Sequence, residues 1–248
     1  YRAGVASAVE VQGLTVRYGD LVAVDGISFR AEHGQVTAVL GPNGAGKTTT
    51  FNLVTGLLRP DQGDVLLDGT SVADQPMPKR ARLGIGYLPQ EASVFRNLSV
   101  RDNLRLALEQ SGTSKERRAD RLEELIADFH LGPFQMRKGF QLSGGERRRC
   151  EVARALAVGD QGPRYLLLDE PFAGVDPMAV SDLQELIGGL RRRGMGVLIT
   201  DHNVRETLAI TDRAYILTDG RILASGCSEA IDDDPLVRRH YLGVAVQM

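Results

Sequence analysis

Short apolar runs recur along the chain, and each of them ends at glycine or at polar and charged residues. They are "QVTAVLG" (35–41), "GIGYLP" (84–89), "YLLLDE" (165–170) and "GVLITDH" (196–202). Runs that are apolar throughout are typical of strands in a parallel sheet covered on both faces. Helical patterns follow several of them, as at 47–57 and at 177–192, which Asp176 and Pro177 suit as cap and first position. The pattern therefore predicts an α/β fold with a mostly parallel sheet.

Three further stretches depart from this alternation. Near the start, "VEVQGLTVRYGD" and "VAVDGISFR" alternate between apolar and polar residues, which predicts a small antiparallel sheet. Late in the chain, Asp219 and Gly220 separate two apolar runs within 215–225, a strong signal for a hairpin. Between about 91 and 160 the spacing is helical and no run resembles a strand, so we expect a helical insertion there.

Composition narrows the class of protein. The 248 residues are 42% hydrophobic, enough for a sizeable core, and 30 basic against 32 acidic residues argue against a nucleic-acid binder. The basic runs 147–149 and 191–193 are interpreted as solvated helix faces. Cys150 and Cys227 lie too far apart for a metal or disulfide motif, which favours a reducing compartment such as the cytoplasm. No apolar run approaches the roughly 20 residues that cross a bilayer.

The segment "GPNGAGKT" (41–48) fits the pattern G-x-x-x-x-G-K-[ST] between a predicted strand and a predicted helix. Backbone N–H groups of such a loop surround phosphate oxygens, and the helix dipole adds positive potential. We expect Lys47 to meet the β- and γ-phosphates and Thr48 to bind Mg²⁺. A tight strand-to-helix turn is the alternative, but it leaves the lysine unexplained. The candidate contacts are Gly41, Pro42, Asn43, Gly44, Ala45, Gly46, Lys47, Thr48 and Thr49.

Carboxylates end the predicted strand "YLLLDE". Open α/β sheets bind ligands at this edge, so Asp169 is expected to hold Mg²⁺ directly or through water. Glu170 would orient or deprotonate the attacking water. Acids after an apolar run are common at ordinary strand ends, and it is the phosphate loop that favours the functional interpretation.

Three further residues occupy strand ends. Tyr18 follows an alternating strand, where its ring is either half-buried or free to stack on adenine. Gln90 stands at the entrance to the helical insertion. His202 follows "VLIT" and is either a satisfied polar group or a hydrogen-bond donor to a γ-phosphate.

A second glycine-rich stretch, "QLSGGERRR" (141–149), raises a different possibility. Ser143 and Glu146 fit a capping box, which explains these two residues without a ligand. A cap does not require Gly144 and Gly145, which cost local order, so we interpret them as room for an approaching anion. One phosphate loop serves one nucleotide, and the second stretch is therefore expected to contact a nucleotide bound to a neighbouring copy.

Taken in order, these motifs resemble those of the ATP-binding cassette (ABC) ATPases over nearly the whole chain. The resemblance rests on Tyr18, the 41–48 loop, Gln90, "LSGGE" (142–146), "LLLDEP" (166–171), Asp176 and His202. It implies a head-to-tail homodimer with two ATP molecules, each between the phosphate loop of one subunit and Ser143 of the other. It also implies that Asp176 couples the two sites, that His202 contacts the γ-phosphate, and that Gln90 contacts the metal and links the nucleotide to the helical insertion.

The same resemblance implies a division of the chain. We expect a single domain with a P-loop NTPase, RecA-like core and an antiparallel β subdomain, a helical subdomain, and a C-terminal helical tail. Their residues are 8–90 and 161–226 for the core, 91–160 for the helical subdomain and 227–248 for the tail.

Longer segments are similar to ATPase subunits of bacterial lipopolysaccharide export systems, among them "GIGYLPQEASVFRNLSVRDNL", "DEPFAGVDP" and "VRRHYLG". This similarity implies a groove, lined by Phe95 and Arg96, for the coupling helices of two polytopic inner-membrane permeases. It implies a cytoplasmic protein that is peripheral on the inner membrane, touches the membrane only through these partners and does not contact nucleic acid directly. Nothing assigns a function to Cys150, Cys227, residues 1–7 or the tail after Gly243.

Three alternatives stay open at this stage. An ATPase of a branched-chain amino-acid importer shares much of the local sequence and differs in its membrane partner. A soluble cassette acting on DNA or ribosomes usually carries two cassettes or a long coiled coil, and the sequence shows neither. A non-hydrolysing structural subunit is disfavoured by Glu170 and His202. Transport direction and the number of ATP molecules used per cycle are not encoded in these residues.

Overall fold

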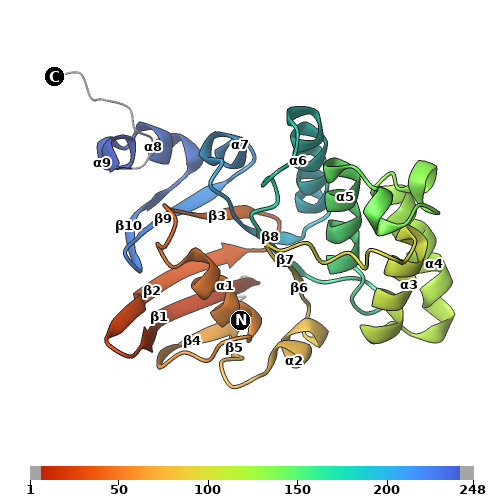
Figure 1. Cartoon of the computed structure of the whole chain (residues 1–248). Helices are drawn as coiled ribbons and strands as arrows, with labels where there is room; N and C mark the ends of the chain where they lie inside the picture. The colour runs from red at the N-terminus through yellow and green to blue at the C-terminus, as the bar shows by residue number, and fades with distance from the viewer. Residues whose placement is uncertain (1–6, 241–248) are drawn as a thin grey trace, which may run out of the picture.

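A six-stranded sheet forms the centre of the molecule in a computed structural model that describes residues 7–240 (Figure 1). Its strand order is β10-β9-β3-β8-β7-β6, and every neighbouring pair is parallel except the β9–β10 hairpin. The predicted α/β class is therefore confirmed. The strands are β3 (Val36–Leu40), β6 (Ile85–Leu88), β7 (Tyr165–Asp169), β8 (Gly196–Thr200), β9 (Arg213–Thr218) and β10 (Arg221–Gly226).

A second, antiparallel sheet has the order β2-β1-β4-β5 and confirms the small sheet expected near the N-terminus. Two of its strands follow the alternating segments, and the other two were not singled out by the sequence pattern. Helix α1 (Lys47–Thr55) lies between the two sheets and contacts strands of both (Figure 1). The strands are β1 (Ala8–Tyr18), β2 (Leu21–Glu32), β4 (Gln62–Leu67) and β5 (Thr70–Ser71).

Between residues 91 and 160, where the sequence shows no strand-like run, the regular elements are helices and 3₁₀ turns. They are α3 (Val100–Gln110), α4 (Lys115–Asp128), α5 (Gly144–Ala155) and the 3₁₀ turns Gly132–Phe134 and Gly139–Gln141. These elements gather at one end of the molecule, on the right in Figure 1. They fall inside the predicted helical subdomain, and the division of the chain into subdomains stays a prediction.

The other helices are α2 (Met77–Arg82), α6 (Pro177–Arg192), α7 (Val204–Leu208), α8 (Ser228–Asp233) and α9 (Pro235–His240). Helix α6 begins as predicted, because Asp176 accepts a hydrogen bond from the N–H of Ala179 at 3.1 Å and Pro177 takes the first position. Helix α1 ends two residues earlier than predicted, at Gly56 in the left-handed region with φ 85°. The tail after Gly243 and residues 1–6 lie outside the described residues.

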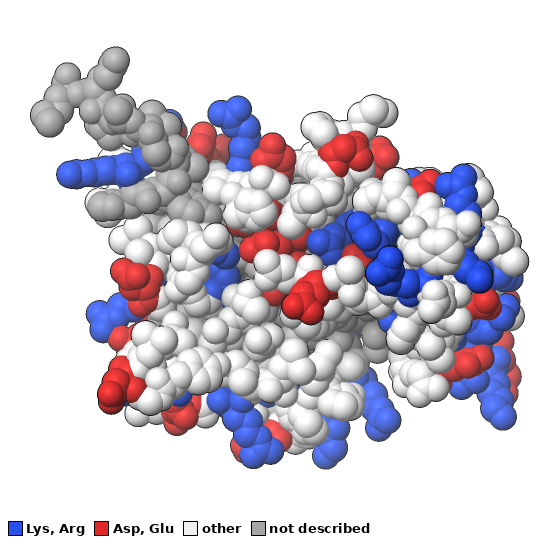
Figure 2. All heavy atoms as spheres, viewed as in Figure 1, with Lys and Arg blue, Asp and Glu red and all other residues white. Residues whose placement is uncertain are grey.

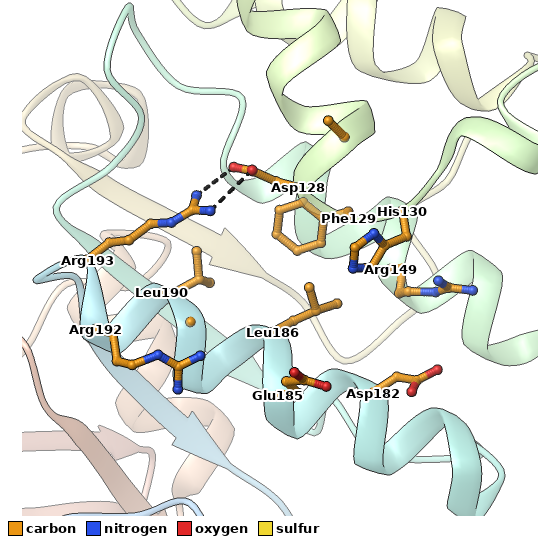
Figure 3. A pocket seen from close by; sticks show the side chains of 12 residues that line it. Asp128, Phe129, His130, Arg149, Asp182, Glu185, Leu186, Leu190, Arg192 and Arg193 are labelled. Atoms are coloured by element: carbon orange, nitrogen blue, oxygen red, sulfur yellow. Dashed lines mark hydrogen bonds and ion pairs between the residues drawn. The ribbon is translucent and has the colours of Figure 1, made fainter.

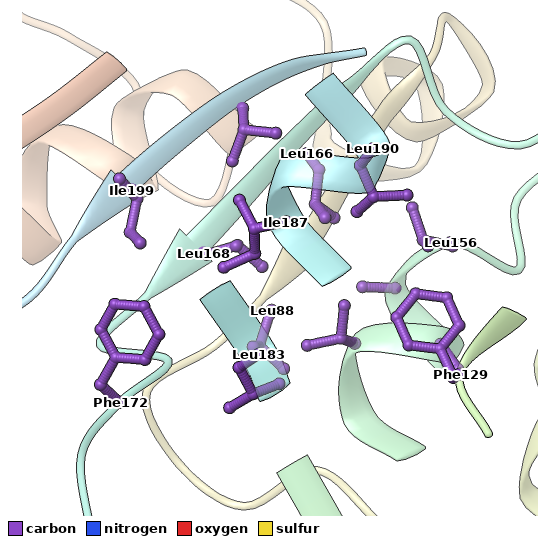
Figure 4. Close-up of a cluster of buried hydrophobic side chains, with 14 of the residues drawn as sticks. Leu88, Phe129, Leu156, Leu166, Leu168, Phe172, Leu183, Ile187, Leu190 and Ile199 are labelled. Carbon is purple, nitrogen blue, oxygen red and sulfur yellow. The ribbon is translucent and has the colours of Figure 1, made fainter. Parts of the chain in front are cut away.

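The core explains why the central strands are apolar throughout. All five residues of β7 and of β8 are buried, since helices cover one face of the sheet and α1 with the second sheet covers the other. Figure 4 shows α6 packed on the first of these faces, with Phe129 of the turn after α4 beside it. The labelled contacts include Leu166, Leu168, Leu183, Ile187, Leu190 and Ile199.

The two cysteines occupy opposite environments, and this predicts their reactivity. Cys150 is fully buried in the core, whereas Cys227 is exposed. Burial raises the pKa of the Cys150 thiol to about 12, so it carries almost no thiolate at pH 8. We expect Ellman's reagent to modify Cys227 rapidly in the native chain and Cys150 only after denaturation. Rapid modification of a Cys227→Ser variant would contradict this packing.

Candidate nucleotide-binding site

The loop between β3 and α1 has a backbone that depends on glycine. Gly46 precedes α1 with φ 100°, and a Cβ on it would lie 2.8 Å from the carbonyl oxygen of Ala23. A Cβ on Gly41 would lie 2.3 Å from the carbonyl oxygen of Leu217. These two glycines let the loop pass closely between β2 and β9, and the position of the loop is thereby fixed before any ligand binds.

A hollow of about 410 Å³ opens at the start of α1. No side chain caps this helix, so its first backbone N–H groups remain available to an anion in the hollow. The start of β2 and the β9–β10 turn form the opposite wall. The loop and strand-end residues that line the hollow are Asn43, Gly44, Gly46, Lys47, Thr48, Thr49, Gln90 and Glu170.

Lys47 is 6% exposed and bends back onto its own loop. Its Nζ donates to the carbonyl oxygens of Gly41 at 2.5 Å and of Pro42 at 3.0 Å. Burial lowers the pKa of Lys47, and the nearby carboxylates of Glu170 and Asp169 act against that decrease. The ammonium group therefore lies between the loop carbonyls and the acidic edge of the sheet. A phosphate oxygen would be a stronger hydrogen-bond acceptor for it than the loop carbonyls are.

Asp169 ends β7 with both carboxylate oxygens buried and without a hydrogen-bond partner of ordinary geometry among residues 7–240. Burial, followed by the charge of Glu170, raises the pKa of Asp169 to about 6, while the neighbouring Thr48 hydroxyl and Lys47 oppose the rise. An unpaired buried carboxylate is costly, and a hard cation with oxygen ligands would remove that cost. Asp169 and Thr48 together therefore fit a Mg²⁺ ion.

Glu170 adopts a left-handed conformation, with φ 51°, that is unfavourable for residues other than glycine. Its N–H donates to the carbonyl oxygen of Thr200 at 2.7 Å, which ties the end of β7 to β8. The carboxylate accepts a hydrogen bond from Nε2 of Gln90 at 3.0 Å and lies 3.5 Å from Nδ1 of His202. The structure thus brings together Gln90, Glu170 and His202 from three separate strand ends.

Asp201 was missed by the sequence reasoning, although it directly precedes the predicted His202. Its side chain is fully buried and accepts hydrogen bonds from the N–H groups of Phe172 and Asn203, both at 2.9 Å. These bonds join the loop after Glu170 to the loop that carries His202. The acid after "VLIT" was the available signal, because it follows a predicted strand in the same way as Asp169 follows "YLLL".

The interpretation of 147–149 as a solvated face is wrong for Arg148. Its side chain is buried on the inner face of α5, where it forms an ion pair with Glu151 at 3.0 Å and donates to the carbonyl oxygen of Glu170 at 3.1 Å. Glu151 in turn accepts from the N–H of Ser93 at 2.9 Å. Arg147 is exposed as expected. Helix α5 therefore connects the Glu170 loop to the chain that follows Gln90.

The capping box at the start of α5 is confirmed, because Ser143 and Glu146 exchange hydrogen bonds of 3.0 and 3.1 Å between side chain and backbone. The interpretation of both glycines as room for an anion stays a prediction, and the structure adds a second reason for one of them. A Cβ on Gly145 would lie 2.5 Å from Cβ of Ala179, so the packing of α5 against α6 already requires this glycine. Residues 143–146 do not line the hollow at Lys47.

Tyr18, Asp176 and Phe95 are not among the residues that line the hollow. The Tyr18 ring at the end of β1 is 51% exposed, which leaves it free to stack on a ligand. Asp176 serves as the N-cap of α6. Phe95 is also half-exposed, and the guanidinium of Arg154 lies 4.9 Å from its ring centroid. Tyr18 is paired with Leu21, which lines the hollow, whereas no such neighbour is seen for Asp176 or Phe95 among the described strand pairs.

A separate hollow of about 460 Å³ lies where the end of α4 faces α6 (Figure 3). Its charges are mixed, and Arg193 is already engaged by both carboxylate oxygens of Asp128, at 2.6 and 3.2 Å. Over the face in Figure 2, basic side chains gather near α5 with acidic ones beside them. Neither feature combines a glycine loop with the uncapped start of a helix, whose backbone N–H groups can bind phosphate, so the hollow at α1 is the candidate phosphate site.

A glycine loop that leads into a helix, with carboxylates on the neighbouring strand ends, defines a P-loop nucleotide-binding protein. The family model described as "ABC transporter" matches residues 24–173. The chain belongs to the ABC transporter family, and it is an ATPase that binds and hydrolyses ATP. The family resemblance found in the sequence is thereby confirmed.

Relatives match nearly the full chain. Lipopolysaccharide export system ATP-binding protein LptB from Acidithiobacillus ferridurans is 51% identical and covers 98% of this chain and 100% of the relative. The protein of the same name from Escherichia coli K12 is 48% identical over 96% and 98% of the two chains. The ADP conformation of an ATP-binding cassette superposes with TM-score 0.84 at 27% identity, covering 96% of this chain and 99% of that chain.

The buried Arg148–Glu151 pair predicts a large difference between two adjacent arginines. Replacing Arg148 by Met leaves the Glu151 carboxylate buried without its cation, and we expect the free energy of unfolding to fall by about 3–5 kcal/mol. Arg147→Met, on the exposed side of the same helix, is expected to change it by less than about 0.5 kcal/mol. Urea denaturation of the two variants measures this difference, and equal losses would contradict the burial of Arg148.

Proposed function

We propose that two copies of this chain close head to tail around two ATP molecules with Mg²⁺ and thereby power lipopolysaccharide extraction and export from the inner membrane. The main support for the cargo is the 51% identity over almost the full length of an LptB protein. The observation that carries the chemistry is the convergence of Gln90, Glu170 and His202 beside the phosphate loop.

In this proposal Glu170 orients and deprotonates the attacking water, because its carboxylate lies at the edge of the hollow next to Gln90. His202 donates a hydrogen bond to the γ-phosphate, and Lys47 exchanges its loop carbonyls for phosphate oxygens. Thr48, Asp169 and Gln90 would hold Mg²⁺, which neutralises charge on the phosphates when bound. Tyr18 would stack on the adenine with its exposed ring.

The second copy is needed because the "SGG" turn does not reach the phosphate hollow of its own chain. Ser143 is exposed at the start of α5, which is the positive end of the helix dipole. We therefore place Ser143, Gly144, Gly145 and Glu146 over the nucleotide of the partner copy. Asp176, at the start of α6, would couple the two sites across the interface.

The membrane partners would dock at a mostly apolar groove of about 240 Å³ between α1, α2, β6, α3 and α5. Thr55, Met77, Ala81 and Arg154 belong to its lining, and Arg154 also contacts the Phe95 ring. We propose that a short amphipathic helix of a polytopic permease occupies the groove, with Phe95 and Arg96 at its border.

Attachment to the membrane would then be peripheral, on the cytoplasmic face. Among the described helices, none combines the length and the apolar character that a bilayer span requires. The chain would contact the membrane only through the two permeases. Mass spectrometry of the proteins that copurify with the tagged chain identifies these permeases. Recovery of an amino-acid importer permease would overturn the lipopolysaccharide assignment.

Glu170→Gln tests the catalytic assignment. The amide cannot accept the water proton, so we expect ATP hydrolysis to slow by roughly 10²- to 10⁴-fold while ATP affinity is retained and an ATP-bound dimer accumulates. Steady-state turnover, equilibrium binding and size-exclusion chromatography measure the three effects. Glu185→Gln, on the exposed side of α6, should behave like the unmodified chain. Near-normal turnover of the Glu170 variant would remove Glu170 from this position in the mechanism.

Phe95→Ala tests the groove. Loss of the half-exposed ring beside Arg154 should reduce copurification of membrane partners several-fold and leave ATP affinity unchanged, because Phe95 does not line the phosphate hollow. Leu236→Ala removes a similarly exposed apolar side chain from α9 and provides the control. Full recovery of the partners with the Phe95 variant would discredit the groove assignment.

A further inference from the structure

Arg80 of α2 is 1% exposed, and no carboxylate lies within ion-pair distance of it in the described part of the chain. All its partners are main-chain carbonyl oxygens. The guanidinium donates to Leu53 at 2.7 Å, Val54 at 2.9 Å, Ala73 at 2.9 Å and Gln75 at 2.8 Å. A buried charge is tolerated only when such bonds satisfy it, so this arrangement fixes the side chain tightly.

Two of these carbonyls, those of Leu53 and Val54, belong to the last turn of α1. Carbonyls at a helix C-terminus lack partners within the helix, and a cation there also interacts favourably with the helix dipole. Gly56 provides the space, since a Cβ on it would lie 2.7 Å from Nε of Arg80. Arg80 therefore holds the end of the helix whose beginning carries Lys47 and Thr48.

Helix α2 also forms part of the apolar groove. Met77 and Ala81 line it from α2, and Thr55, the last residue of α1, lines it beside them. Lys47 and Thr55 are the first and last of the nine residues of α1, and the rise of 1.5 Å per residue places them about 12 Å apart along the helix axis. A short helix of this kind moves as a rigid unit when one end is displaced.

We propose that Arg80 is a positioning residue that clamps α1 to α2, so that a displacement in the groove changes the position of Lys47 and Thr48 at the phosphate site. This inference rests on the proposed function in one respect only, namely that a permease helix is the natural occupant of the groove. The clamp itself concerns ATP binding by this chain and needs no membrane protein.

The test places a bulky probe in the groove of the purified full-length chain. Cys227→Ser removes the exposed native thiol, Ala81→Cys introduces one in the groove, and pyrene maleimide modifies it. We expect the modification to change the affinity for a fluorescent ATP analogue with Mg²⁺ by about three- to tenfold, the size of one or two hydrogen bonds. In an Arg80→Lys background, which keeps the charge but loses the planar fork, the change should fall below about 1.5-fold.

Arg82→Lys, an exposed arginine of the same helix, is the matched control and should retain the full response. Equal responses in the Arg80 and Arg82 variants, or no response with Arg80 intact, would overturn the proposal. Hydrogen exchange of residues 41–55 before and after modification gives a second measurement that needs no Arg80 variant. Unchanged exchange there would also overturn it. Because no membrane partner takes part, this outcome is separate from the copurification result.

Discussion

Negative charge at the carboxyl edge of the parallel sheet is the constraint on which the site depends. Asp169, Glu170 and Asp201 meet there in a largely buried setting, and the Lys47 ammonium lies near all three. Asp201 is satisfied by backbone N–H groups, whereas Asp169 has no such partner among residues 7–240. The unpaired Asp169 carboxylate is the feature that fits a divalent cation, which when bound would offset the negative charge that phosphates meet at this edge.

The order of the strands places these groups together. Strand β8 lies between β3, which leads into the phosphate loop, and β7, which ends in Asp169. Strands β7 and β8 are buried along their whole length and have Asp169 and Thr200 at their ends, and the ends of parallel strands share one edge. The left-handed backbone of Glu170 then turns its carboxylate toward Gln90 and His202, held there by hydrogen bonds to Thr200 and Arg148.

The sequence predicted the features of the fold that depend on interactions between residues close together in the chain. The apolar runs, the phosphate loop and the Asp176 cap depend on neighbouring residues, and each was found as expected. Burial of Arg148 and the packing reason for Gly145 depend on α5 meeting β7 and α6 from distant parts of the chain. A run of three arginines looks the same in sequence whether its middle residue faces water or a buried glutamate, and pairing at i and i+3 was the available hint.

Helix α1 runs from the phosphate hollow to the apolar groove, and its dipole points along this path. Its first N–H groups, left uncapped at Gly46, face the phosphate hollow with positive potential. Its last carbonyls carry the opposite potential and are met by the Arg80 guanidinium. A phosphate at the N-terminus and the Arg80 guanidinium at the C-terminus both interact favourably with the helix dipole. The two interactions therefore stabilise the same orientation of α1. Contacts at both ends oppose the fraying to which a helix of nine residues is prone.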